Sequence, residues 1–235
     1  MELLRLLIRK SACYIDIGAN VGRYAWFMTQ NAGTDLRIYA FEPNPRAADL
    51  LRTALAGGRN VEIFTVALAE SDRKSVLRVP RDAHGNPVSA LGWIDGAGAP
   101  ESVGEHNIEC RALDSLIAAG EVVADRPLFL KIDVEGAELS VLEGARELLA
   151  HVRPALYFEC EAPHLERAGR SPDALWEFLT DAGYRIFRED GETFRHAESV
   201  HKGISNYFAI SFALEDDPKT TYTAMELAEK FGSDI

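Results

Sequence analysis

The stretch Tyr14-Ile-Asp-Ile-Gly-Ala-Asn-Val-Gly-Arg23, followed by Tyr39-Ala-Phe-Glu-Pro-Asn44, decides the fold class of this 235-residue chain. An apolar run, a glycine turn and a helical pattern predict a buried strand that leads into a helix, and the second stretch predicts a strand that ends at Glu42. Open α/β sheets hold adenosine-containing ligands in this way. The first turn lets the ligand approach the backbone, and an acid at the tip of the second strand can accept its ribose hydroxyls.

The glycine spacing indicates which ligand to expect. The turn has the form Gly-x-x-x-Gly with Asn20 in the middle, whereas a dinucleotide fingerprint requires Gly-x-Gly-x-x-Gly. Asp16, at the end of the first strand, would repel a diphosphate but suits a ligand with cationic groups. S-adenosylmethionine carries an ammonium and a sulfonium, so the pattern predicts this cofactor. The residues expected around it are Asp16, Gly18, Asn20, Gly22 and Glu42.

Length and composition indicate a single α/β domain over residues 1–235, with an insertion at about residues 75–125. The net charge of −12 disfavours nucleic acid as a partner, because binding to a phosphate backbone relies on clustered Lys and Arg. Residues 1–10 are too short and too charged for a signal peptide or a membrane span. We therefore expect a cytoplasmic protein that binds neither nucleic acid nor a membrane.

The three cysteines, Cys13, Cys110 and Cys160, lie far apart in the sequence, and no Cys-x-x-Cys motif occurs. This pattern indicates neither a zinc site nor a disulfide framework, and buried thiols in a reducing compartment are the simpler interpretation.

Apolar runs alternate with helical patterns, which predicts a mostly parallel sheet covered by helices on both faces. The expected strands are residues 13–17, 36–41, 61–67, 128–133, 155–160, 184–188 and 205–213, and the expected helices are residues 1–10, 22–31, 45–56, 137–150, 172–182 and 220–231. The insertion breaks this rhythm with two alternating segments around a long loop at residues 80–107. Loops of this length in compact domains are often lids or binding loops, although a plain surface loop fits the sequence equally well.

The block Leu130-Lys-Ile-Asp-Val-Glu-Gly-Ala-Glu138 concentrates charge at the end of a predicted strand. Lys131, Asp133 and Glu135 alternate onto one face, where they cost desolvation unless they are paired or functional. Lys131 can neutralise a neighbouring carboxylate, and Asp133 lies where a cofactor and an acceptor would meet. The alternative is a capping arrangement in which Glu135 and Glu138 interact with the dipole of the following helix.

Glu159 lies late in the next apolar strand, so it is expected at the same cleft as Asp133 and Glu135. These three carboxylates are the candidate catalytic residues. Our leading interpretation contains no metal, but the same oxygens could bind Mg²⁺ in a metal-assisted variant. His164 follows in the loop beyond, where an isolated histidine is more often a polar loop residue than a base.

The motifs together resemble the FkbM-type methyltransferase family, within the class I S-adenosylmethionine-dependent enzymes. The resemblance covers about residues 13 to 160 and rests on Asp16-Ile-Gly-Ala-Asn-Val-Gly-Arg23, Phe41-Glu-Pro-Asn-Pro45, Val66-Ala-Leu68, Leu113-Asp-Ser-Leu116, Leu130-Lys-Ile-Asp-Val-Glu-Gly-Ala-Glu138 and Phe158-Glu159.

The resemblance implies a Rossmann-like, seven-stranded sheet and O-methylation of a hydroxyl on a small molecule, such as a sugar, a polyketide or another secondary metabolite. It places Asp16, Gly18, Asn20 and Glu42 on the cofactor, Ala67 near the adenine, and Asp133 and Glu135 at the reaction centre. Two features depart from the family pattern. The family often has an acid beside the adenine, whereas this sequence has Ala67 and Leu68 at that place. The chain also begins almost at its first strand, so a cap of the active site ahead of that strand is expected to be short or absent.

Other function classes fit less well. A nicotinamide-dependent oxidoreductase would need the missing middle glycine, and a nucleic-acid methyltransferase is opposed by the acidic charge and by the lack of an Asn-Pro-Pro-Tyr block. A non-catalytic binding or scaffold protein could keep the same fold, and failure to bind the cofactor would favour it. The expected partner is a small hydroxylated acceptor of undetermined identity, and a homo-oligomer remains open.

Overall fold

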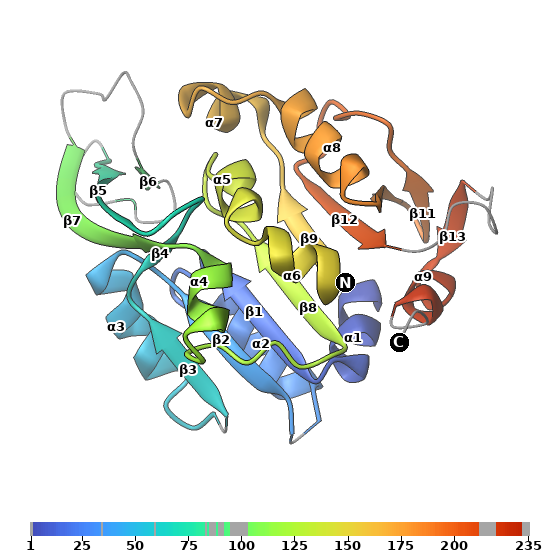
Figure 1. Cartoon of the computed structure of the whole chain (residues 1–235), viewed down its shortest axis with the longest axis horizontal. Coiled ribbons are helices and arrows are strands. Elements are labelled where there is room, and N and C mark those ends of the chain that lie inside the picture. The colour runs from blue at the N-terminus through green and yellow to red at the C-terminus, as the bar shows by residue number, and fades with distance from the viewer. Residues whose placement is uncertain are drawn as a thin grey trace.

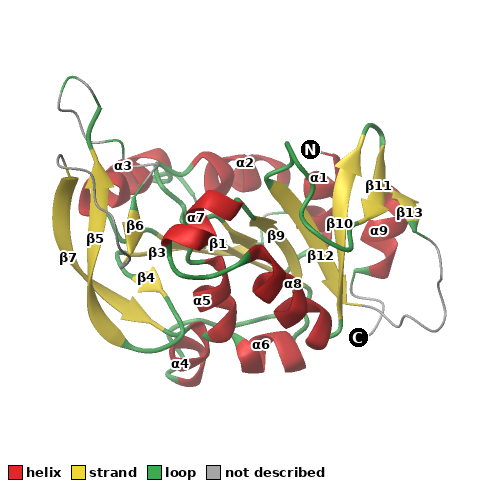
Figure 2. Ribbon diagram, turned by 90° about the horizontal axis from the view of Figure 1, so that it is seen from above, coloured by secondary structure: helices red, strands yellow, loops and turns green. Residues whose placement is uncertain are grey.

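The computed structural model describes residues 2–33, 35–58, 60–82, 84, 88, 92–94, 103–211 and 220–231. Within these residues the chain forms a nine-stranded main sheet and a separate four-stranded sheet at one side (Figure 1). Helices cover both faces of the main sheet, as Figure 2 shows, which confirms the expected layered α/β arrangement.

The main sheet has the strand order β13-β11-β10-β12-β9-β8-β1-β2-β3. Its parallel half comprises β3 (Val61–Phe64), β2 (Arg37–Phe41), β1 (Cys13–Ile17), β8 (Leu128–Ile132) and β9 (Ala155–Glu159). Its antiparallel half comprises β12 (Asn206–Ser211), β10 (Tyr184–Asp190), β11 (Thr193–His196) and β13 (Thr221–Thr223).

The predicted count of seven strands, most of them parallel, is wrong, because the described sheet has nine strands of mixed direction. The sequence analysis missed β11 and β13. The chain reverses after β10 through Gly191, which has a positive φ of 65°, so that Asp190 pairs with Thr193 across a two-residue hairpin. β13 then pairs with β11 and lengthens the antiparallel edge.

On one face of the main sheet lie α1 (Glu2–Lys10), α2 (Arg23–Asn31) and α3 (Pro45–Ala54), and α9 (Ala224–Lys230) packs beside α1. On the other face lie α4 (Leu113–Ala118), α5 (Glu138–Glu143), α6 (Arg146–His151) and α8 (Pro172–Asp181), while α7 (Ala162–Arg167) follows β9. Strand β1 is buried throughout and alternates between the two cores, with Ile15 and Ile17 in one and Tyr14 in the other. No helix in the described part of the chain has the length and apolar character needed to cross a membrane.

The helix expected over residues 137–150 is two helices, α5 and α6, separated at Gly144. A Cβ at Gly144 would collide with the carbonyl of Ala69, so another segment of the chain passes too close for an ordinary helical residue. The carbonyl of Gly144 also accepts a hydrogen bond from the backbone of Asp114, which belongs to α4. This tertiary contact overrides a continuous helical pattern in the sequence.

The insertion forms the second sheet, in the order β4-β7-β5-β6. β5 (Arg73–Pro80) and β7 (Val103–Arg111) pair antiparallel, which confirms the two expected strands, and β6 (Trp93–Ile94) and β4 (Ala67–Leu68) flank them. The strand expected over residues 61–67 therefore ends at Phe64. Most of the loop predicted at residues 80–107 and part of the strand predicted at residues 205–213 lie outside the described residues.

Candidate active site

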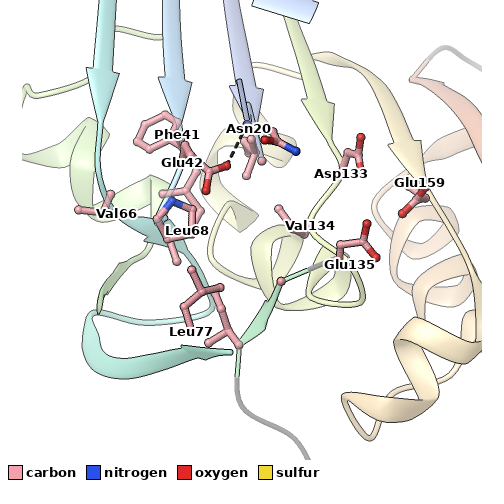
Figure 3. Close-up of a pocket in the computed structure, with 16 residues that line it drawn as sticks. Asn20, Phe41, Glu42, Val66, Leu68, Leu77, Asp133, Val134, Glu135 and Glu159 are labelled. Atoms are coloured by element: carbon pink, nitrogen blue, oxygen red, sulfur yellow. Dashed lines mark hydrogen bonds between the residues drawn. The ribbon is translucent and has the colours of Figure 1, made fainter. Parts of the chain in front are cut away.

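A cavity of about 240 Å³ opens where β1, β2, β8 and β9 end at their carboxyl sides. It is lined by Ile17, Gly18, Asn20, Phe41, Glu42, Pro43, Val66, Ala67, Leu68, Leu77, Gly92, Ile94, Asp133, Val134, Glu135 and Glu159. Glu42 and the apolar side chains Phe41, Val66, Leu68 and Leu77 occupy one end, and Asp133, Glu135 and Glu159 occupy the other (Figure 3). The insertion contributes Leu77, Gly92 and Ile94, so it forms part of the cavity wall.

The glycine turn after β1 depends on left-handed backbone. Gly18 has a φ of +73°, and a Cβ there would collide with the carbonyl oxygen of Asp133, at the neighbouring strand end. Asn20 is left-handed as well, with a φ of 50°. Gly22 does not line the cavity; a Cβ there would lie 2.7 Å from Leu51 Cδ1, so this glycine instead allows α3 to pack closely.

Glu42 is held in place by the backbone. Its Oε2 accepts a hydrogen bond from the Asn20 amide at 2.9 Å, and its Oε1 accepts one from the Asn44 amide at 2.8 Å. Burial raises the pKa of the Glu42 carboxyl, and these two amide donors oppose that rise. Each oxygen keeps acceptor capacity, because a carboxylate offers about four lone-pair sites.

Lys131 forms the centre of a buried charge network. Its Nζ lies 3.2 Å from Asp16 Oδ1 and 3.4 Å from Asp133 Oδ2, and it donates to the Gly18 carbonyl at 2.9 Å. It also lies 5.1 Å from the centre of the Tyr24 ring. Burial opposes the charged ammonium, but the two carboxylates outweigh burial and raise the pKa of Lys131.

The structure does not bring the Asp16 carboxylate to the cavity. Asp16 points to the face of β1 that carries Tyr14, is fully buried and is paired with Lys131. The predicted contact between this carboxylate and the cofactor is therefore not supported by its position. Asp16 instead supports the site through Lys131, which in turn contacts Asp133 and the Gly18 carbonyl.

A second group of ionisable side chains lies at the other end of the cavity. Glu135, directly after β8, meets His164 in α7, with His164 Nδ1 2.9 Å from Glu135 Oε2 and 3.9 Å from Glu159 Oε2. Burial raises the pKa of Glu135 to about 7 and that of Glu159 to about 8, and the negative charge of Asp133 adds to both shifts. Burial also lowers the pKa of His164. We call Glu135, Glu159 and His164 the Glu–Glu–His cluster.

Tight backbone geometry places this cluster. Glu135 itself has a positive φ of 56°, and Gly136 follows with a φ of 108°. A Cβ at Gly136 would collide with the His164 carbonyl, so glycine allows the β8 turn to press against α7. Glu138, the first residue of α5, accepts hydrogen bonds from the amides of Val134 and Gly136, so its side chain stabilises the turn that precedes the helix.

Two contributions escaped the sequence analysis. The sequence analysis favoured a polar loop residue at position 164, yet His164 lies in α7 and belongs to the cluster. Its place three residues after Glu161, shortly beyond the acid-bearing end of β9, was the available signal. Arg167 donates to the Glu135 carbonyl at 3.2 Å, and its guanidinium lies 4.7 Å from the centre of the Trp93 ring. Arg167 therefore links α7, the β8 turn and the insertion.

Residues 16–186 match the model of the methyltransferase FkbM domain. The chain belongs to this family. It is 28% identical over 154 residues to the hexuronic acid methyltransferase AglP of Haloferax volcanii, covering 64% of this chain and 58% of that protein. It is 26% identical over 171 residues to the 2-O-methyltransferase NoeI of Sinorhizobium fredii, covering 65% of each.

Among solved structures, a methyltransferase FkbM from Methylobacillus flagellatus is similar, with 20% identity and a TM-score of 0.50. The match covers 86% of this chain and 44% of that one, and it supports the α/β methyltransferase fold. This FkbM-family chain covers less than two thirds of the length of each of these three proteins.

Proposed function

We propose that this FkbM-family chain transfers a methyl group from S-adenosylmethionine to a hydroxyl oxygen of a small molecule. The observation that carries the proposal is one continuous cavity. At one end lies Glu42, whose carboxylate can accept hydrogen bonds from ribose hydroxyls, and at the other end lie the carboxylates of Asp133, Glu135 and Glu159. A donor bound along the glycine turn would present its reactive group towards those carboxylates.

The residues present fit the cofactor. Gly18 lines the cavity without a side chain, so a ligand can approach the backbone of the turn, and the Glu42 oxygens retain lone pairs for two ribose hydroxyls. Phe41, Val66 and Leu68 form an apolar wall suited to a flat ring, with Ala67 beside them. Asp133 offers a carboxylate to an ammonium group. When bound, S-adenosylmethionine supplies an activated methyl group on its sulfonium.

The chain itself contributes alignment and proton transfer. Glu42 and the Gly18 turn would hold the donor, and alignment of its methyl group with the acceptor oxygen would be their main contribution. Asp133 would orient the acceptor hydroxyl and take its proton during the transfer. Lys131 keeps the Asp133 carboxylate in position through the 3.4 Å ion pair.

A polyhydroxylated acceptor such as a sugar is the best-supported substrate class. Carboxylates accept hydrogen bonds from hydroxyls, and Glu135 and Glu159 provide such acceptors beside Asp133. The names of two relatives, a hexuronic acid methyltransferase and a 2-O-methyltransferase, support the same choice. The net charge of −12 disfavours a nucleic-acid substrate.

The first test is calorimetric titration of the chain with S-adenosylmethionine and S-adenosylhomocysteine, with NADH as the control ligand. We expect micromolar binding of the first two and none of NADH. Binding of NADH, or of none of the three, would contradict the proposal.

A pair of variants tests the division of roles. Glu42→Ala should weaken cofactor binding at least about tenfold, because it removes the ribose acceptor, whereas Asp133→Ala should reduce turnover by about 10²-fold or more with a smaller effect on binding. Glu62→Ala, at an exposed position in β3, is the matched control. Equal losses of binding in the two site variants would refute this division.

A further inference from the structure

The Glu–Glu–His cluster presents one atom from each residue to a common point. Glu135 Oε2, Glu159 Oε2 and His164 Nδ1 all lie within 4.8 Å of one another. Each atom is buried, and none has a hydrogen-bond partner in the described structure. Each buried polar atom without a hydrogen bond costs folding free energy, so three such atoms close together require an explanation.

Hydrogen bonding within the cluster does not provide that explanation. His164 Nδ1 and Glu135 Oε2 lie 2.9 Å apart, yet their alignment does not make a hydrogen bond. A short distance without hydrogen-bond alignment is the arrangement expected of two ligand atoms that face one shared ion.

The cluster also lacks a cationic side chain to balance it. Lys131 is engaged by Asp16, Asp133 and the Gly18 carbonyl. Arg167 donates to the backbone carbonyl of Glu135 rather than to its carboxylate. Within the described ranges, neither Glu135 nor Glu159 forms an ion pair with a lysine or an arginine, and the charge of Arg167 only partly offsets the burial that raises the pKa of Glu135.

We propose that Glu135, Glu159 and His164 bind a divalent transition metal, Mn²⁺ or Zn²⁺, at the acceptor end of the cavity. The proposal deepens the proposed function and rests on it for the role of the metal, though not for the site itself. One imidazole nitrogen with two carboxylate oxygens suits these ions, whereas Mg²⁺ prefers oxygen ligands alone. The metal-assisted variant considered from sequence used Mg²⁺ on Asp133, Glu135 and Glu159; the structure replaces Asp133 with His164.

The surroundings of His164 fit this assignment. Its second ring nitrogen, Nε2, faces Glu161 Oε2 at 3.8 Å, and Glu161 is itself held by a hydrogen bond from the Ser205 hydroxyl at 2.7 Å. Histidines that bind metals usually present the other ring nitrogen to a carboxylate or a carbonyl, which fixes the tautomer. The close approach of Gly136 to the His164 backbone fixes the imidazole relative to Glu135.

Three protein ligands leave positions open for a substrate oxygen, as in catalytic metal sites. A metal held there would supply Lewis acidity that lowers the pKa of an acceptor hydroxyl bound at an open position. Asp133 would then take the hydroxyl proton, while the oxygen forms its bond to the methyl carbon and the carbon–sulfur bond of the donor breaks.

The test is calorimetric titration of the full chain, stripped with a chelator and then exchanged into chelator-free buffer, with MnCl₂, ZnCl₂ and MgCl₂ in the absence of S-adenosylmethionine. We expect one equivalent of Mn²⁺ or Zn²⁺ to bind at least about tenfold more tightly than Mg²⁺. His164→Ala and Glu159→Gln should each weaken binding about 10- to 100-fold. His151→Ala, which removes an exposed histidine at the end of α6, should leave binding unchanged.

Absence of metal binding, equal binding of Mg²⁺, or equal affinity in His164→Ala and His151→Ala would each overturn the proposal. Circular dichroism on every variant establishes that it is folded, and Glu159→Gln provides a second reading if His164→Ala does not fold.

Titration of the same samples with S-adenosylmethionine separates the metal proposal from the proposed function. Cofactor binding and full methyl transfer in excess chelator would overturn the metal's role in catalysis and leave the proposed function standing. Metal binding without cofactor binding would keep the site and overturn the function.

Discussion

Two groups of charged side chains lie at the same edge of the main sheet, and they are built differently. In the Lys131 network, an ammonium contacts two carboxylates and a carbonyl, and Lys131 is only 2% exposed. In the Glu–Glu–His cluster, two carboxylates face a histidine without a lysine or arginine partner among the described residues, and the three side chains are 15–20% exposed. The first group contains its own cation, whereas the carboxylates of the second have no lysine or arginine ion pair among the described residues.

The two groups share one sequence block but differ in where its residues lie relative to β8. Lys131 lies within β8, where it faces β1 and is enclosed by Asp16, Gly18 and Tyr24. Glu135 lies just beyond the strand, where a left-handed turn directs it to α7. We therefore expect substitutions of Asp16 and Lys131 to affect folding first, and substitutions in the cluster, or of Asp133 beside it, to affect ligand binding and catalysis.

The largest expected effect is that of Lys131→Met, which leaves Asp16 buried without its cation. The free energy of unfolding should fall by about 3–5 kcal/mol, because an unpaired buried charge is strongly destabilising. Urea unfolding followed by circular dichroism measures the change, with Lys74→Met at an exposed position in β5 as the control. The double variant with Asp16→Asn should recover part of the loss. A loss below about 1 kcal/mol in the single variant would show that the network is not structural.

Gly18→Ala should have the second-largest effect on stability. The new Cβ would displace the backbone of Asp133, which lies between the Lys131 network and the Glu–Glu–His cluster. The left-handed φ of +73° alone should cost about 1–3 kcal/mol, and the new Cβ must displace the Asp133 carbonyl. Cofactor affinity should fall with stability, as measured by unfolding and by calorimetry. Gly57→Ala is the matched control, since a Cβ at Gly57 meets no atom within 4 Å. Equal behaviour of the two variants would contradict a close turn at Gly18.

Glu159→Gln should lower methyl transfer without lowering the free energy of unfolding, unlike Lys131→Met. Because burial raises the pKa of Glu159 to about 8, its carboxyl is mostly protonated at neutral pH, and glutamine replaces it with little change of charge. The free energy of unfolding should therefore stay within about 0.5 kcal/mol of the parent. Methyl transfer should fall by about 10²-fold or more. Glu177→Gln, exposed on α8, should change neither quantity. A large loss of stability with activity retained would reverse our assignment of the cluster.

The smallest expected effect concerns Arg167, which connects the cluster to the insertion. Arg167→Gln should cost about 1 kcal/mol of stability, because it loses a hydrogen bond to Glu135 and the contact with the Trp93 ring. If the insertion helps to bind the acceptor, its KM should rise more than kcat falls. Arg46→Gln, at an exposed position in α3, is the control for loss of positive charge. An unchanged KM would argue against coupling between the insertion and the acceptor.

Local patterns predicted the parallel half of the sheet well. β1, β2, β8 and β9 lie within one residue of the expected bounds, because each is a short apolar run ended by a glycine turn, a proline or a charged residue. The same patterns placed Glu42, Asp133 and Glu159 at strand ends, and all three line the cavity. The break at Gly144 and the hairpin after β10 escaped prediction because they depend on contacts or turn geometry that a periodic pattern does not reveal.

The sequence by itself determined the α/β class, the glycine turn and the acids at the strand ends, because backbone preferences and apolar periodicity are local properties. Only the tertiary structure decided which acids have a cation. Asp16 and Lys131 are 115 residues apart in the chain, and they meet because β1 and β8 are neighbours in register. His164 joins Glu135 because Gly136 permits α7 to approach the turn. The charges around a carboxylate come from neighbours in space and not in sequence. The sequence therefore identified the carboxylates, but only the fold shows which of them have a lysine or arginine partner.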